Sequence, residues 1–263
     1  MKLGILILAY QAEDTIASVL ARIPEETFRA AEGIYIFDDA STDRTSDVAC
    51  ACARTHAFRN KIHVHTNPKN LGYGGNQKHA YRFALKNGLE AVVMVHGDGQ
   101  YAPELLSQIY SPIMRGEADL VFGSRMTGNP LRGKMPLHKF IGNQALTQIQ
   151  NLLVGSRFSE FHSGYRAFRT RCFQDIPHSA CTSGFHFDTQ ILILFFDRHF
   201  RIHEVSIPTF YGDEISRVRI VSYGLRVIGE ALKYWALRRA PFPIPGMVND
   251  LYQSPQIANG RQE

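Results

Sequence analysis

The sequence predicts an α/β fold in which helices flank a mostly parallel central sheet. Short apolar or β-branched runs, typical of buried strands, alternate with segments whose apolar residues recur at helical spacing. Most of these runs are followed by a polar, glycine-rich turn, as expected for parallel strands joined by helices. The chain has 263 residues, 44% of them hydrophobic, which is enough to bury the core of one domain.

The predicted elements follow one another from the N-terminus to about residue 124. Strands are expected at residues 3–9, 33–37, 61–66, 91–95 and 120–122. Helices are expected between them at residues 14–23, 42–54, 75–87 and 103–115. Ser41 or Thr42 would cap the second helix, and Pro103 would open the last.

After about residue 124 the alternation changes. A Gly- and Pro-rich loop at residues 128–136 precedes a helix expected near residues 138–153, and a compact stretch follows at residues 160–166. We expect a flexible tail, rich in Pro and polar residues, at residues 241–263. The expected domain therefore covers residues 1–212, with halves at about residues 1–124 and 125–212.

Residues 213–240 are predicted to form an amphipathic helical segment. Its apolar residues at helical spacing are Val221, Leu225, Ile228, Leu232 and Trp235. Its basic residues include Arg219, Arg226, Lys233, Arg238 and Arg239. A basic amphipathic helix can lie on an anionic bilayer with its apolar face buried. Packing of the same residues against the sheet is the competing explanation, and the usual one for a helix at the end of a compact domain.

Composition limits the partners and the location. Lys and Arg number 29 against 24 Asp and Glu, which suits nucleotides, lipid phosphates or a membrane surface; we expect no nucleic-acid partner. The four cysteines match no zinc spacing and favour a reduced setting. The first apolar run is too short for a signal sequence, and no run could span a bilayer. We therefore expect a cytoplasmic protein, with at most peripheral contact with the cytoplasmic face of the membrane.

Polar residues follow three of the expected strands, at residues 10–13, 38–43 and 96–100. Ligands of open parallel sheets bind at the carboxyl ends of the strands, so these segments share a candidate site. A carboxylate there can accept the N–H of a nucleobase, and Tyr10 can stack on the base. Capping of the following helix is the competing explanation for Asp38, Asp39 and Ser41.

A glycine-containing segment, NLGYGGN at residues 70–76, opens an expected helix. Backbone N–H groups at such a place can approach a ligand closely, although a tight turn would need the same glycines. The spacing matches neither the Walker loop nor the dinucleotide-binding glycine pattern.

Six motifs together resemble glycosyltransferase family 2, whose members have the GT-A fold. They occur in the family's order: AYQAED at 9–14, FDDASTDRT at 37–45, NLGYGGN at 70–76, HGDGQY at 96–101, GSR at 123–125 and HSGYRAF at 162–168. The chain looks most like the branch that transfers mannose or glucose to polyprenyl phosphates such as dolichol phosphate. The resemblance covers about residues 3–211.

The resemblance implies transfer of a sugar from a UDP- or GDP-sugar, with inversion, in cell-envelope glycan biosynthesis. It places the nucleotide at Ala9, Tyr10, Glu13, Asp38, Asp39, Gly72 and Asp98. It places a divalent cation, Mn²⁺ or Mg²⁺, at Asp98, Gln100 and His96. Arg125 and Arg166 would face the acceptor or the pyrophosphate.

Two positions depart from the family pattern. Gln11 and Ala12 stand where Asn-Glu is usual, which weakens the base contacts expected there. His96 stands where the family's Asp-x-Asp corner has its first aspartate. Imidazole suits Mn²⁺ better than Mg²⁺, and the donor diphosphate supplies oxygens of its own, so a metal site remains feasible. Alternatively, His96 ends a strand and bonds a turn.

The acceptor decides whether a base is needed. A lipid phosphate is already anionic and can be held by arginines, whereas a hydroxyl of a glycan or small molecule needs a carboxylate such as Asp188 or Glu160. Asp188 could equally cap or pair within its helix. A nucleotidyltransferase is a rival, although the early glycine-rich loop with Arg and Lys is absent. A non-catalytic nucleotide-sugar-binding protein, with His96 marking a lost metal site, is another.

Overall fold

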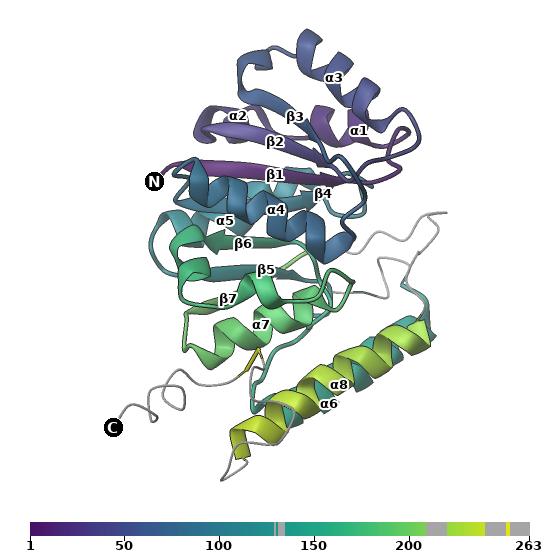
Figure 1. The fold of residues 1–263 in the computed structure, drawn as a ribbon, viewed down its shortest axis with the longest axis vertical. Coiled ribbons are helices and arrows are strands. Elements are labelled where there is room, and N and C mark those ends of the chain that lie inside the picture. Colours follow the sequence, from purple (N-terminus) through teal and green to yellow (C-terminus); the bar gives the residue numbers. More distant parts are fainter. Residues whose placement is uncertain (129, 131–134, 209–219, 240–250, 253–263) are drawn as a thin grey trace.

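A seven-stranded sheet forms the centre of the molecule, in the strand order β3-β2-β1-β4-β6-β5-β7 (Figure 1). The computed structural model describes residues 1–128, 130, 135–208, 220–239 and 251–252. Only β6 runs against its neighbours, β4 and β5; the other adjacent pairs are parallel. The predicted α/β class with a mostly parallel sheet is thus confirmed. The strands are β1 Leu3–Ala9, β2 Gly33–Asp38, β3 Ile62–Thr66, β4 Ala91–His96, β5 Leu120–Ser124, β6 Arg166–Arg169 and β7 Ile202–Ser206.

Helices cover both faces of this sheet. Ile5 and Ile7 of β1 belong to one core and Leu6 and Leu8 to the other, because successive strand residues point to opposite faces. Burial on both faces explains why β1 is an unbroken apolar run. The first core is covered by α1 Ile16–Ala21, α2 Glu25–Ala30, α3 Thr45–Thr55 and α5 Leu106–Met114, and the second by α4 Tyr73–Lys86 and α7 Phe187–Asp197. Short 3₁₀ turns lie at Arg59–Lys61, Pro103–Leu105, Thr170–Gln174 and His178–Ala180.

The predicted strands and helices of the first half are present, with shifted ends. The predicted caps are wrong: α3 begins at Thr45, and neither Ser41 nor Thr42 precedes it directly. Asp43 Oδ1 instead accepts the backbone N–H of Thr45 at 3.0 Å. Pro103 opens a 3₁₀ turn rather than α5 itself. No bounds are predicted from the sequence for α2, α7, β6 or β7.

Two long helices, α6 Leu137–Val154 and α8 Ile220–Arg239, lie side by side away from the sheet layers (Figure 1). The face of α8 that carries Val227 and Ala231 is buried. The predicted apolar stripe faces outward: Val221 is 78% exposed and Leu225 is 69% exposed. The prediction that this stripe packs against the sheet, which is the usual arrangement, is therefore wrong. None of the described helices is long and apolar enough to cross a membrane.

The tail prediction falls mostly outside the described residues. Tyr252, within it, is buried; its hydroxyl donates to Glu230 at 3.1 Å, and its ring packs against Tyr234. The boundary expected near residue 212 also lies outside the described residues and stays a prediction. β6 and β7 come from the second half of the expected domain, yet they join the sheet of the first half.

Candidate active site

Three polar segments meet at one edge of the sheet, as the sequence predicts. In the strand register Ala9 of β1 lies beside Asp38 of β2, and Leu8 lies beside His96 of β4. The backbone confirms this closeness, because Asp39 N–H donates to the carbonyl of Ala9 at 2.9 Å. The residues that follow β1, β2 and β4 therefore form one site at the carboxyl edge.

Ser41 joins the loops after β1 and β2. Its hydroxyl accepts the N–H of Gln11 at 2.9 Å and donates to Asp38 Oδ1. Gln11 and Ala40 have φ of 53° and 55°, a left-handed conformation that is uncommon outside glycine and is often found at functional sites. Asp38 Oδ2 is buried and has no hydrogen-bond partner among the described residues. A bound molecule or water at this point would satisfy it.

The other residues predicted to bind the nucleotide divide into exposed and bracing groups. Tyr10 is 43% exposed, so its ring can stack on a planar ligand. Glu13 Oε2 accepts the N–H of Arg44 at 2.8 Å and so braces the loop before α3. Asp39 Oδ1 accepts the N–H groups of Asn67 and Leu71 at 2.9 and 2.8 Å, which ties in the loop before α4. Ala9 is buried at the end of β1.

The glycines of residues 70–76 pack against the backbone of Thr182 and Ser183. Gly74 N–H donates to the carbonyl of Ser183 at 2.8 Å. A Cβ added at Gly72 would lie 2.8 Å from that carbonyl oxygen, and one at Gly74 would lie 2.5 Å from the carbonyl oxygen of Thr182. Gly72 and Gly74 thus have a packing role, and contact of Gly72 with the nucleotide stays a prediction. These glycines admit the loop that leads into α7.

We expect Gly74→Ala to lower the free energy of unfolding by about 1–3 kcal/mol, because the new methyl group meets backbone atoms. Gly142→Ala is the matched control on α6, where an added Cβ has nothing within 4 Å. Helix propensity should make this control neutral or slightly stabilising. Urea denaturation of both variants measures the difference; equal stabilities would contradict the packing role.

The HGDGQY segment makes a tight corner after β4. Asp98 Oδ1 accepts the N–H of Gln100 at 3.1 Å, and His96, Asp98 and Gln100 are all partly exposed. An imidazole nitrogen, a carboxylate oxygen and an amide oxygen form a donor set that suits Mn²⁺. The described residues contain no cluster of three His, Cys, Asp or Glu side chains that could hold a metal alone. The corner thus fits a cation that takes further oxygens from a second molecule.

A hydrogen-bonded chain connects this corner to α7. The Tyr73 hydroxyl donates to Asp188 Oδ2 at 2.6 Å, and His96 Nε2 lies 3.3 Å from the Tyr73 oxygen. Burial and the neighbouring Asp188 carboxylate raise the pKa of Tyr73 well above its ordinary value, so the phenol keeps its proton. Asp188 is only 4% exposed, and its Oδ1 also accepts from Gln77 at 3.3 Å. The imidazole of His96 therefore bonds a tyrosine, while the backbone carbonyl of His96 accepts the N–H of Gly99 in the turn at 3.5 Å.

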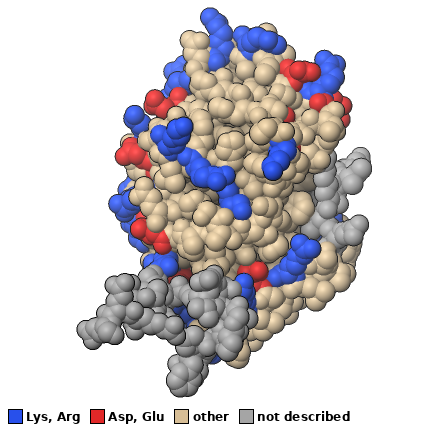
Figure 2. All heavy atoms as spheres, viewed as in Figure 1, with Lys and Arg blue, Asp and Glu red and all other residues tan. Residues whose placement is uncertain are grey.

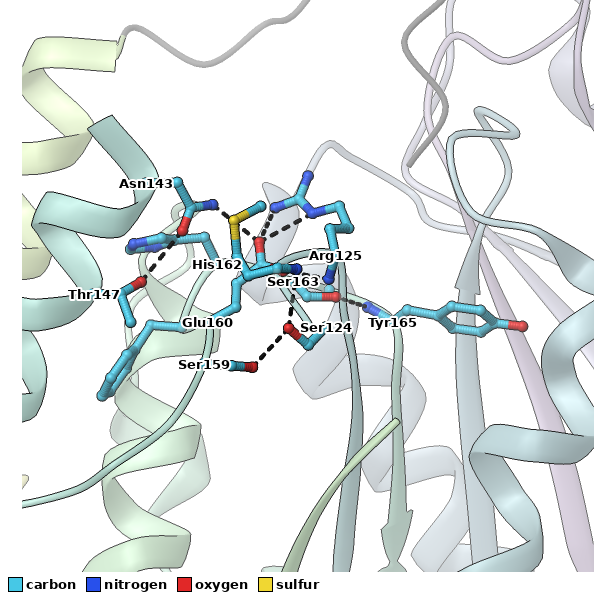
Figure 3. A network of polar contacts seen from close by, with 12 residues as sticks. Ser124, Arg125, Asn143, Thr147, Ser159, Glu160, His162, Ser163 and Tyr165 are labelled. Carbon is cyan, nitrogen blue, oxygen red and sulfur yellow. Dashed lines mark hydrogen bonds and ion pairs between the residues drawn. The ribbon is translucent and has the colours of Figure 1, made fainter. Parts of the chain in front are cut away.

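Glu160 lies at the centre of a second network, beside the end of β5 (Figure 3). Its carboxylate forms an ion pair with Arg125, accepts the N–H of Arg125 at 2.8 Å and accepts from Asn143 of α6 at 3.0 Å. Burial alone would raise the pKa of Glu160, but the charge and hydrogen bonds of Arg125 hold the pKa below its ordinary value. Glu160 thus connects the sheet to α6 as a buried carboxylate.

The structure corrects the role expected of Arg166. Its side chain is fully buried, and each part of the guanidinium donates to a backbone carbonyl: Nε to Ser163 at 2.8 Å, Nη1 to Asp188 at 2.7 Å and Nη2 to Phe161 at 3.0 Å. These bonds hold residues 161–166 against the start of α7. Arg166 supports the site and does not face a ligand, whereas Arg125 is 20% exposed at its edge.

The sequence did not single out two tyrosines that shape the site. Tyr73 lies within NLGYGGN, a segment whose recognisable sequence signal is its glycines. Tyr223 of α8 lies with its hydroxyl 2.9 Å from His162 Nδ1. Burial lowers the pKa of His162 to about 4, although the Glu160 carboxylate opposes this shift, so the imidazole is neutral at pH 7. Its contact with Tyr223 joins α8 to the site.

The sequence of the chain is similar to those of known proteins. The model of the family described as glycosyl transferase family 2 matches residues 4–177. A UDP-N-acetylglucosamine–dolichyl-phosphate N-acetylglucosaminyltransferase from Methanococcus voltae is 27% identical over 234 residues, which cover 85% of this chain and 92% of that protein. A polyprenol monophosphomannose synthase from Mycolicibacterium smegmatis is 26% identical over 206 residues, covering 78% and 76%.

Solved structures show the same fold. Glucosyl-3-phosphoglycerate synthase from Mycobacterium tuberculosis, crystallised with Mn²⁺, UDP and phosphoglyceric acid, superposes with a TM-score of 0.65 at 18% identity. The match covers 93% of this chain and 80% of that one. At this identity the likeness concerns the fold, which is GT-A.

Proposed function

Because the chain belongs to glycosyltransferase family 2, we propose that it transfers a sugar from a UDP- or GDP-sugar to a polyprenyl phosphate. Family membership sets aside the nucleotidyltransferase alternative. The M. voltae and M. smegmatis relatives carry dolichyl phosphate or polyprenol in their names, which supports a lipid acceptor.

The choice of a phosphate acceptor rests on the burial and hydrogen bonding of the two candidate bases, Asp188 and Glu160. Asp188 is buried against Tyr73 and Gln77, and Glu160 is buried in its ion pair with Arg125. Neither carboxylate is placed to take a proton from a hydroxyl group in solvent. A phosphate acceptor is already ionised and needs no such base. The same state argues against a hydroxyl acceptor.

In the proposed reaction, a phosphate oxygen of the acceptor attacks the anomeric carbon of the sugar. The new bond forms between that carbon and the acceptor oxygen, while the bond to the donor diphosphate breaks and the nucleoside diphosphate leaves. A single displacement of this kind inverts the anomeric configuration. Tyr10, Asp38 and Asp39 would hold the nucleoside, and Arg125 would attract the anionic acceptor.

The donor diphosphate would lie at the HGDGQY corner. Asp98, Gln100 and His96 would hold Mn²⁺ or Mg²⁺ there, and a bound cation would neutralise charge on the leaving diphosphate. Support comes from the donor set itself and from the M. tuberculosis synthase that was crystallised with Mn²⁺ and UDP. Imidazole in this set favours Mn²⁺.

A direct assay tests the proposal. Radiolabelled UDP- and GDP-sugars are incubated with the protein, Mn²⁺ and a polyprenyl phosphate, and the organic phase is counted. Label in a mild-acid-labile lipid is the expected result. Transfer to a soluble hydroxyl acceptor but not to the lipid would overturn the acceptor, and donor binding without any transfer would point to a non-catalytic protein.

The proposal includes peripheral contact with an anionic membrane through α6 and α8. Eight of the eleven exposed large apolar side chains among the described residues lie on these helices: Leu137, Ile141, Ile149, Leu152, Val221, Leu225, Leu232 and Trp235. We call them the two-helix apolar surface. Much of the molecular surface over α6 and α8, at the lower right of Figure 2, is neither acidic nor basic.

Charge favours a bilayer over a second copy of the chain at this surface. The two helices contain one acidic residue, Glu230, against five Lys and Arg: Lys139, Arg226, Lys233, Arg238 and Arg239. Basic residues beside an apolar stripe attract anionic lipid, whereas two such surfaces would repel each other. Free thiols agree with the cytoplasmic face.

We expect Val221→Glu/Leu225→Glu to reduce co-sedimentation with phosphatidylglycerol vesicles at least tenfold, because two exposed apolar anchors become anionic. Stability should change by no more than about 0.5 kcal/mol. Ala51→Glu/Thr55→Glu, on the exposed face of α3, adds the same charges at the same spacing and should leave vesicle binding intact. Absence of vesicle binding by the unaltered protein, with dimers in sedimentation, would contradict the membrane contact.

A further inference from the structure

The hydroxyl of Tyr73 has a fixed hydrogen-bonding direction. It has one proton, and the hydroxyl donates that proton to Asp188 Oδ2 at 2.6 Å. Its oxygen can therefore only accept from His96, 3.3 Å away.

This direction determines which nitrogen of His96 carries the proton. The nitrogen that faces Tyr73 is Nε2, so Nε2 carries the proton of this hydrogen bond, and an imidazole with a single N–H then has its lone pair on Nδ1. Nδ1 has no hydrogen bond within the described part of the chain. A neutral imidazole with one lone pair is the form that coordinates a metal.

The packing around His96 fits its ring closely. Tyr73 and Tyr101 both meet the imidazole edge-on, with ring centroids 5.4 and 5.2 Å away. A Cβ on Gly164 would lie 2.6 Å from His96 Cε1 and 2.5 Å from the Tyr73 oxygen. The Tyr101 hydroxyl accepts the N–H of Gly164 at 2.9 Å, which holds this backbone in place. The ring therefore has little freedom to turn.

We infer that Tyr73 and Asp188 are positioning residues, which hold His96 in the tautomer and orientation of a metal ligand. The inference rests on the proposed function, in which the HGDGQY corner holds the cation of the donor. Ligating histidines usually donate their other N–H to a partner that fixes the ring. Here the partner is a tyrosine oriented by a carboxylate, so Asp188 acts through Tyr73 and His96 and not as a base.

The test measures Mn²⁺ affinity by electron paramagnetic resonance, with saturating UDP or GDP. Tyr73→Phe removes only the hydroxyl and should weaken Mn²⁺ binding about 10- to 100-fold. Asp188→Leu should do the same, whereas Asp188→Asn keeps an acceptor oxygen and should lose less. Tyr234→Phe, which removes a buried hydroxyl that donates to Asp197 at 3.1 Å, is the matched control outside this network and should bind Mn²⁺ normally.

A double-variant comparison separates positioning from general damage. Once His96→Ala has removed the ligand, adding Tyr73→Phe should cost no further Mn²⁺ affinity. Long-range ¹H–¹⁵N spectra of the metal-free protein should also show His96 protonated at Nε2, and Tyr73→Phe should mix the two tautomers.

Distinct results separate this inference from the proposed function. An unaltered protein that binds no Mn²⁺ with either nucleotide would overturn the donor site itself. If the unaltered protein binds Mn²⁺ and Tyr73→Phe binds it equally well, the positioning role alone is overturned. A His96 that is protonated at Nδ1 would overturn it as well.

Discussion

Asp98→Asn is expected to reduce sugar transfer by about 10³-fold, the largest loss of activity that we predict at this site. Asp98 contributes the one carboxylate of the HGDGQY corner, and an amide in its place neither binds a divalent cation as well nor offsets the charge of the cation. The variant should fold normally, because Asp98 is partly exposed at the end of a strand. The measurement is the initial rate with saturating donor and Mn²⁺, beside a melting curve.

Asp14→Asn provides the control, since it removes an exposed carboxylate from the neighbouring AYQAED segment. Its transfer rate should match that of the unaltered protein. An Asp98→Asn enzyme of normal rate and normal Mn²⁺ dependence would contradict the placement of the cation at this corner.

Arg166→Met is expected to lower the free energy of unfolding by about 3 kcal/mol or more. The substitution keeps much of the side-chain volume but leaves three buried carbonyls, those of Phe161, Ser163 and Asp188, without their donors. Each unsatisfied buried acceptor costs about 1–3 kcal/mol. Chemical denaturation measures the loss.

The same substitution at Arg171, which is exposed, should change the stability by no more than about 0.5 kcal/mol. A stable Arg166→Met protein with weakened affinity for a phosphate acceptor would restore the ligand-binding role first expected of Arg166. An unstable protein agrees with the buried bracing seen in the structure.

The sheet could be predicted because its strands carry a local signal. β1 and β4 are buried on both faces, so their sequences are continuous apolar runs ended by polar turns. The four-residue β6 begins with a charged residue and has no such signal. In α7 the run Ile191–Phe196 is apolar on every side, a pattern that does not distinguish a buried helix from a strand.

The sequence predicts the edge of the sheet at which the site lies and the motifs that form it. It does not predict which side chains contact one another there. The carboxyl ends of β1, β2 and β4 had to meet once the sheet was parallel. Nothing local to Gly74 indicates that it packs against Thr182, more than a hundred residues later. Arg166 was misjudged for a related reason: a buried arginine needs partners, and its partners are backbone carbonyls that no sequence pattern identifies.

The position of β6 between β4 and β5 affects the order in which the chain can fold during its synthesis. β5, at residues 120–124, leaves the ribosome before β6, at residues 166–169, yet among the described strands only β6 connects it to β4, because β7 pairs with its outer edge. Until then β4 has an open edge and the apolar β5 has no partner, a state prone to aggregation. The first 124 residues thus contain most of the donor-side motifs but lack β6, the strand that joins β5 to β4.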